Sequence, residues 1–65
     1  MPKQYADEIR RIIKAANGDA VRAILEEIPK SSWRYVIGEA IASPQVEVDS
    51  QLAEDLGAIQ VELKN

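Results

Sequence analysis

The chain contains no cysteine and no histidine, and these two absences exclude much of the chemistry available to a small protein. Without cysteine there is no disulfide to stabilise the fold, and the absence also fits a reducing compartment. Without either residue, a zinc site would need carboxylates alone, which is unusual for zinc. A serine nucleophile would need a lysine base or the help of a carboxylate. We therefore expect a protein that is not an enzyme and holds neither a metal nor a cofactor.

Glycine-rich loops and long apolar runs are also missing. The three glycines stand apart from one another, so the chain has no phosphate-binding loop. No apolar run is long enough to span a membrane, and the first residues have none of signal-peptide length. Apolar residues make up 46% of the chain, which favours a folded domain over disorder. We expect a single domain, residues 1–65, located in the cytoplasm and without membrane contact.

The shortness of the chain predicts self-association. A domain of 65 residues buries a smaller fraction of its surface than a larger one, so its core leaves little stability to spare. Disulfides are excluded and a metal is not expected. Contact with a second copy is the remaining way to bury more surface, and we therefore expect a homodimer.

Apolar residues recur at three- and four-residue spacing along most of the chain, which is the pattern of amphipathic helices. The pattern predicts helices at about 3–16, 20–28 and 32–42. Short connections between them favour a compact all-α bundle. The apolar stripe of the first helix comprises Tyr5, Ile9, Ile12, Ile13 and Ala16.

Turn and capping residues mark the helix boundaries. Gly18 should end the first helix in the left-handed conformation, and Asp19 is a natural N-cap for the second. Ser31 or Ser32 should cap the third. Gly38 lies inside that third helix, where glycine costs about 1 kcal/mol relative to alanine. We expect the close approach of a neighbouring helix to explain it.

The end of the chain admits two interpretations. Alternation of polar and apolar residues at 45–49 and 58–63 predicts a small two-stranded β-ribbon beside three helices. Leucine and isoleucine spaced four, three and four apart predict instead a fourth helix over 50–64, with a face that contacts a second copy. This self-association seam comprises Leu52, Leu56, Ile59 and Leu63. Gly57 decides between the two, because a positive φ there would end the helix. We favour a bundle of three to four short helices, with the ribbon as the alternative.

Charge is distributed unevenly along the chain. Residues 1–35 carry seven basic and five acidic side chains, whereas residues 36–65 carry one basic and six acidic. The acidic C-terminal half predicts a surface that contacts a basic protein partner. Tyr35 lies off the apolar stripe of its helix and is a natural interface anchor. The expected partner-binding residues are Tyr35, Glu39, Glu47, Asp49, Glu54, Asp55 and Val61. The leading hypothesis is a protein-interaction module: an adaptor, an inhibitor or an accessory subunit.

The alternative hypothesis is a dimeric helix-turn-helix DNA-binding regulator. The helices at 20–28 and 32–42 are joined by a short turn, and the second would serve as the recognition helix. Its expected nucleic-acid contacts are Lys30, Ser31, Ser32 and Arg34. The net charge of −3 counts against this hypothesis, because attraction to phosphate dominates DNA binding.

Overall fold

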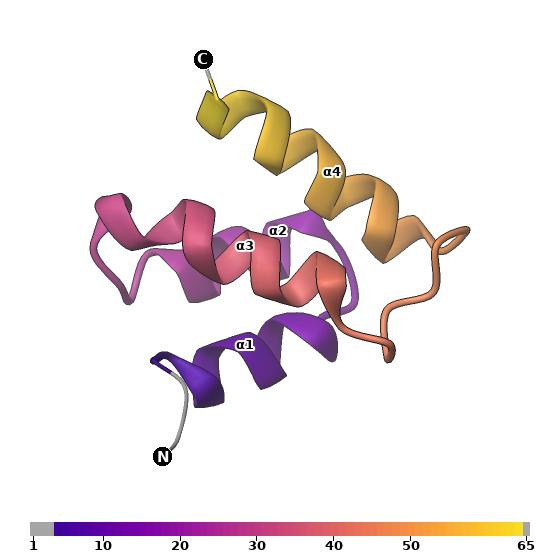
Figure 1. Ribbon diagram of the computed structural model, residues 1–65, viewed down its shortest axis with the longest axis horizontal. Helices are drawn as coiled ribbons and strands as arrows, with labels where there is room; N and C mark the ends of the chain where they lie inside the picture. The colour runs from indigo at the N-terminus through magenta and orange to yellow at the C-terminus, as the bar shows by residue number, and fades with distance from the viewer. Residues whose placement is uncertain (1–3, 65) are drawn as a thin grey trace.

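The structure is a computed structural model, and it describes residues 4–64. It confirms the prediction of an all-α bundle (Figure 1). The described part of the chain contains four α-helices, one short 3-10 helix and no strand. The elements are α1 (Ala6–Ile13), α2 (Gly18–Leu25), the 3-10 helix η1 (Lys30–Ser32), α3 (Trp33–Ala42) and α4 (Gln51–Lys64). None of these helices is both long and apolar enough to cross a bilayer.

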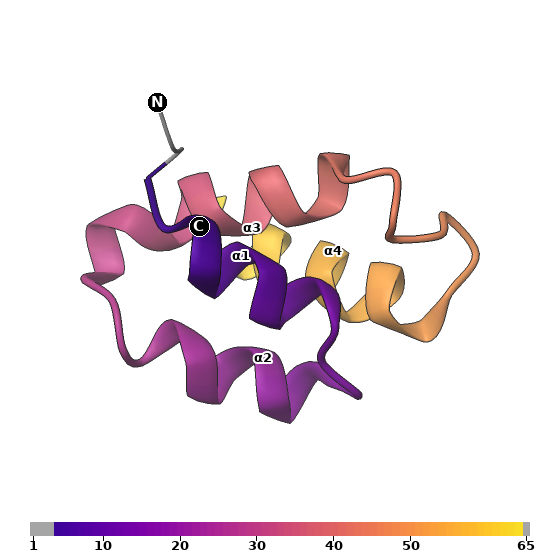
Figure 2. The same ribbon diagram turned by 90° about the horizontal axis from the view of Figure 1, so that it is seen from below.

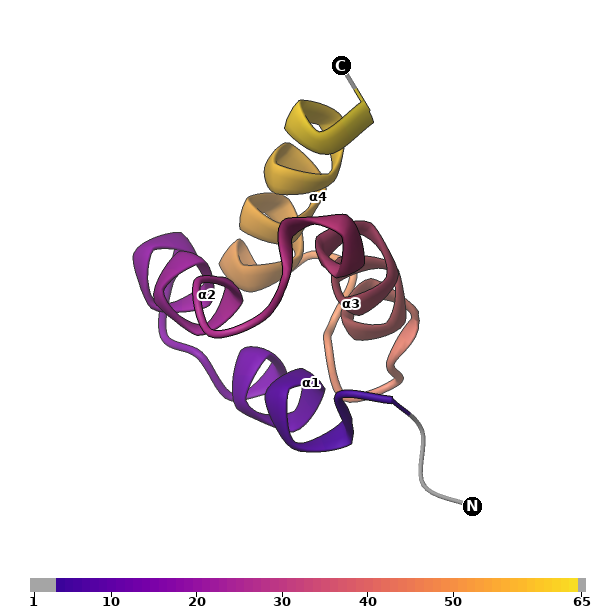
Figure 3. The same ribbon diagram turned by 90° about the vertical axis from the view of Figure 1, so that its left-hand side faces the viewer.

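The helices occupy the four corners of a square when the bundle is viewed along its length (Figure 3). α3 packs on α4 and α1, and α2 packs on the same two helices from the other side. Consequently α2 and α3, although consecutive in the chain, lie diagonally across the bundle. Figure 2 shows them on opposite sides, with α1 and α4 between them.

The core is built from the inward faces of all four helices, as the three- and four-residue spacing predicted. Burying each large aliphatic side chain contributes roughly 1.5–3 kcal/mol, so these residues dominate the stability of the bundle. Among the described residues, no polar or charged side chain is buried. The largest fully buried side chains are Ile12, Val21, Leu25, Val36, Ile37 and Leu56.

α4 runs without a break through Gly57, whose φ is not positive. The β-ribbon alternative is therefore wrong for both of its segments, because 58–63 is helical and 45–49 forms turns. Ser50 caps the helix, with its Oγ accepting a hydrogen bond from the Ala53 amide at 3.1 Å. The helix prevails because only helical spacing places its leucines and isoleucine on one buried side.

α1 begins later than predicted, at Ala6 rather than near residue 3, which lies outside the described residues. Tyr5 precedes the helix in the left-handed conformation, with a φ of 60°. A non-glycine residue in that region is uncommon and carries backbone strain. The Tyr5 hydroxyl lies 3.2 Å from the Ser32 hydroxyl, and this contact joins the start of α1 to the start of α3.

α2 begins at Gly18, and the predicted boundary there is wrong. Asn17 is the N-cap, with its Oδ1 accepting a hydrogen bond from the Ala20 amide at 3.0 Å. Gly18 does not adopt a positive φ but belongs to the helix, as does Asp19. The Gly18 amide donates to the Asp55 carboxylate of α4 at 3.1 Å. The first amides of a helix have no partner within the helix itself. In α2 the side chains of Asn17 and Asp55 accept hydrogen bonds from two of these amides.

α3 is preceded by the 3-10 turn rather than by a serine cap. Ser32 occupies the N-cap position, but its side chain accepts no capping hydrogen bond. Its amide instead donates to the Pro29 carbonyl at 2.9 Å, and its hydroxyl faces Tyr5. The prediction that a serine hydroxyl caps this helix is therefore wrong, because a backbone turn and a contact between helices take its place.

Gly38 has open space around it, which contradicts the expected close approach of a neighbouring helix. An ideal Cβ at this position would meet nothing within 4 Å, leaving aside adjacent residues and the backbone of its own helix. We predict that Gly38→Ala raises the free energy of unfolding by about 0.5–1 kcal/mol, because alanine lowers the entropy lost on forming a helix. Thermal unfolding should shift upward by about 4–8 °C per kcal/mol. A lower melting temperature would mean that the space around Gly38 is occupied.

A bidentate ion pair joins α1 to the turn after α2. The Arg11 guanidinium donates to both oxygens of Glu27, at 2.8 and 3.2 Å. The hydrogen bonds and positive charge of Arg11 lower the pKa of Glu27 below its ordinary value. Since the pKa falls on folding, the pair stabilises the fold above the unfolded-state pKa, and this contribution is lost as the pH falls through the folded-state pKa.

We predict that Glu27→Gln destabilises the protein at neutral pH and that the difference from wild type disappears in acid. Both side chains are about half exposed, so the effect should be small and should weaken in salt. Urea unfolding measured at a series of pH values tests this. The exposed neighbour Glu26 provides the control variant Glu26→Gln. If Glu27→Gln and wild type still differ in stability by the same amount once Glu27 is protonated in acid, the stabilising role of the Arg11–Glu27 pair would be contradicted.

Candidate functional site

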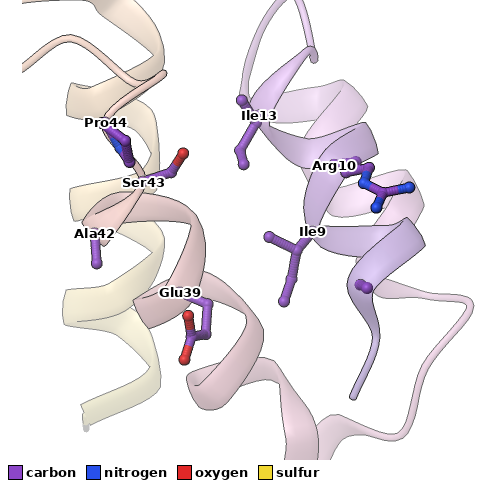
Figure 4. Close-up of a pocket in the computed structure, with 8 residues that line it drawn as sticks. Ile9, Arg10, Ile13, Glu39, Ala42, Ser43 and Pro44 are labelled. Atoms are coloured by element: carbon purple, nitrogen blue, oxygen red, sulfur yellow. The ribbon is translucent and has the colours of Figure 1, made fainter. Parts of the chain in front are cut away.

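An open groove lies between α1 and α3, on the outside of the bundle (Figure 4). Its volume is about 490 Å³. One wall comes from α1, and the other comes from the C-terminal half of α3 and the residues that follow it. The lining residues are Ala6, Ile9, Arg10, Ile13, Glu39, Ala42, Ser43 and Pro44.

Small side chains help to keep the groove open. α1 and α3 run side by side in the same direction (Figure 1). At their N-terminal ends the Tyr5 and Ser32 hydroxyls are in contact. Ala6, which directly follows Tyr5, and Ala42, the last residue of α3, contribute only methyl groups, so neither side chain fills the space between the helices.

The α1 wall is hydrocarbon. Ile9 and Ile13 both point from α1 toward the α3 side (Figure 4). Ile9 is buried against the core, whereas Ile13 is half-buried and presents part of its side chain to the groove. This wall can therefore accept an apolar side chain from another molecule.

Charged side chains of opposite sign stand on the two sides of the groove. The Arg10 guanidinium points outward from α1, while Glu39 lies on α3 (Figure 4). Arg10 also forms a 3.6 Å ion pair with Asp7, in which both side chains are mostly exposed. Such an exposed pair contributes little to stability, so Arg10 remains available for contact with another molecule.

Two of the predicted partner-binding residues belong to this region. Tyr35 is 40% exposed and precedes Glu39 by about one turn of α3. Glu39 lines the groove itself. Ala42 lies a further turn along the same side of the helix and was not predicted as a site residue. The helical spacing that predicted an exposed Tyr35 thus also indicated the outer edge of the site.

The remaining predicted partner-binding residues lie elsewhere. Glu47 and Asp49 are exposed in the loop that continues from Pro44. Glu54 and Val61 are exposed on α4, which lies diagonally opposite α1 and does not line the groove. The seven residues therefore do not form a single surface, because α3 and α4 present them on different sides of the bundle.

Asp55 has a structural role that the sequence did not reveal. One carboxylate oxygen accepts from the Gly18 amide, and the other accepts from the Gln51 side chain at 3.0 Å. An acidic group at a helix N-terminus is electrostatically favourable, so Asp55 stabilises the contact of α4 with α2. Its role in binding a partner stays a prediction.

The predicted self-association seam faces the interior of its own chain. Leu56 and Ile59 are 0% and 3% exposed, and Leu52 and Leu63 pack against the same core. The four residues do share one face, as predicted, but other helices of the chain already cover much of it. A second copy could not bind to this face unless the core opened. The homodimer therefore stays a prediction, and this face does not provide its interface.

The predicted DNA-binding unit is not assembled as a packed pair of helices. α2 and α3 lie diagonally, and each packs on α1 and α4 instead. Lys30 and Arg34 are exposed, as is Ser31, but the Lys30 Nζ lies 5.6 Å from the centre of the Trp33 ring. The Ser32 hydroxyl faces Tyr5. The helix pair expected of a helix-turn-helix unit is therefore not formed by α2 and α3, and the nucleic-acid contacts stay a prediction.

Comparison with protein-family models, with curated proteins and with solved structures gives no significant match.

Proposed function

We propose that the protein is a non-enzymatic protein-interaction module that receives apolar side chains of its partner in the groove between α1 and α3. The observation that supports this proposal is the groove itself, whose α1 wall of Ile9 and Ile13 remains open beside the core. Tyr35 adds an exposed aromatic ring on the neighbouring side of α3. Tyrosine is enriched among the residues that dominate binding energy at protein interfaces.

The lining suits a protein partner better than a small molecule. Sites for small molecules enclose most of the ligand and place a few polar groups around it for orientation. This groove is open, so it could not enclose most of a small molecule. An open groove that mixes aliphatic side chains with charged and polar ones resembles instead the centre and rim of a protein interface.

The acidic C-terminal half contributes to the proposed surface through one edge of the groove. Glu39 lies in that edge, and Glu47 and Asp49 follow in the adjoining loop. These groups would favour basic side chains on the partner segment that lies against α3. The homodimer expected from the size of the chain is tested separately by light scattering, where a monomer at high concentration would contradict it.

A peptide-display selection on the purified protein tests the proposed function. Peptides enriched on the wild type should lose binding on the variant Ala42→Glu, because a charged side chain would enter the groove. The matched control is Ala23→Glu, which places the same charge at an exposed site on α2. Loss of binding on both variants, or no enrichment at all, would contradict the proposal. Circular dichroism confirms that both variants are folded.

A further inference from the structure

We propose that the segment bound in the groove is an amphipathic helix of two to three turns whose two flanks carry charges of opposite sign. This inference rests on the proposed function and specifies the partner of the same site. Three features of the groove support it: its backbone chemistry, its length and the distribution of charge on its two edges.

Backbone chemistry favours a helix over an extended peptide. Binding of an extended peptide usually depends on free main-chain donors and acceptors at the edge of a sheet. α1 and α3 form most of both walls, Ser43 and Pro44 follow α3 in the second wall, and the residues described contain no strand. Most main-chain groups of these walls are engaged within the helices, and the carbonyls of the last turn of α3 do not form the row of alternating donors and acceptors that an extended peptide needs. A bound helix satisfies its own main chain, so it loses no hydrogen bonds by docking there.

The length of the walls sets the length of the occupant. The α1 wall runs from Ala6 to Ile13, 8 residues that correspond to about 12 Å at 1.5 Å per residue, and the opposite wall runs from Glu39 to Pro44. A segment of two to three turns fits this length. Its apolar anchors would follow the i, i+3 or i+4, i+7 pattern that helices use in grooves. These anchors would contact Ile9, Ile13 and the methyl group of Ala42.

The charges on the two edges of the groove predict a different charge for each flank of the bound helix. The α1 edge carries Arg10, which is ion-paired with Asp7, and the exposed Lys14 about one turn further along, so its net charge is positive. The opposite edge carries Glu39 and continues into the acidic loop with Glu47 and Asp49. A helix with acidic residues on one flank and basic residues on the other complements both edges at once. A helix with two flanks of the same sign meets like charge on one side.

Three fluorescent peptides test the inference directly. All have about 14 residues and the same leucine anchors, and their flanks are mixed, uniformly acidic or uniformly basic. Anisotropy titrations should show the mixed peptide binding about three- to tenfold more tightly than either uniform peptide, since only the mixed peptide meets opposite charge on both edges and exposed ion pairs are individually weak. The difference should shrink at high ionic strength because salt screens exposed charges.

A change of charge at Arg10 should switch the preference. In Arg10→Glu both edges are acidic, and the uniformly basic peptide should become the tightest binder. The control variant Arg34→Glu makes the same change at an exposed α3 position that does not line the groove, and the order should stay as in wild type. Equal binding of all three peptides to every variant would overturn the charged-flank inference while leaving the proposed function in place. Absence of binding by all three would contradict both.

Discussion

Leu56→Ala should lower the free energy of unfolding by about 2–5 kcal/mol, which is a large part of the stability of so small a domain. Leu56 is fully buried and belongs to α4, the segment whose conformation was ambiguous in the sequence. The substitution removes buried methyl groups and leaves a cavity that the surrounding core residues fill only in part. Urea unfolding followed by circular dichroism measures the change.

The matched control for Leu56 is Val61→Ala in the same helix. Val61 is 60% exposed, so its loss removes little buried surface, and alanine forms helices better than valine. The control should therefore stay within about 0.5 kcal/mol of wild type. Equal effects of the two substitutions would show that α4 does not bury the face that the structure assigns to the core.

Gly57→Pro should cost about 3 kcal/mol or more and should largely unfold the domain. Gly57 lies in the middle of α4, between the two buried residues Leu56 and Ile59. Proline there lacks an amide hydrogen, and its ring clashes with the carbonyl four residues earlier. The substitution would separate the two halves of the face that packs on the core. Loss of the cooperative thermal transition is the expected observation.

Two further variants test whether the loss of stability is specific to proline in the middle of α4. Gly57→Ala should stabilise the protein by about 0.5–1 kcal/mol, since an ideal Cβ at this position meets nothing within 4 Å. Gln51→Pro places proline in the first turn of α4, where helices tolerate it, and should cost far less than Gly57→Pro. A stable Gly57→Pro variant would mean that the helix ends near Gly57, as the ribbon interpretation required.

The bundle could be predicted because its helices follow the spacing of their apolar residues. Leu56 and Ile59 illustrate this, since the same spacing that predicted α4 also predicted the face that α4 buries. The alternation of 58–63 was misleading because Val61, which supports a strand, is simply exposed on the helix. Helical spacing prevailed because it buries more apolar surface in a bundle.

Contacts between distant segments could not be predicted in the same way. The Ser32 hydroxyl was predicted to cap α3, but it faces Tyr5, 27 residues earlier in the chain. Asp55 was predicted to bind a partner, and it also accepts a hydrogen bond from Gly18, 37 residues earlier. Local patterns contain no information about which segments meet, and these polar residues serve whichever donor or acceptor the packing brings to them.

The groove was missed for a related reason. Ile9 and Ile13 belong to the apolar stripe of α1, and a stripe alone does not distinguish a covered side chain from one that borders an open groove. Nothing in the sequence marked Ala42 as a site residue. In the structure its small size helps to leave the space open. Only the Tyr35 and Glu39 side of α3 could be identified from helical spacing.

Nuclear magnetic resonance mapping of the mixed-flank peptide on the 15N-labelled protein tests whether the groove between α1 and α3 is the binding surface. The shifted amide signals should concentrate in α1 and in residues 39–44, with the α4 signals almost unchanged. The methyl signals of Ile9 and Ile13 should show intermolecular contacts with the leucines of the peptide. Shifts concentrated on α4, or no saturable shifts at millimolar peptide, would contradict the assignment of the groove as the binding surface.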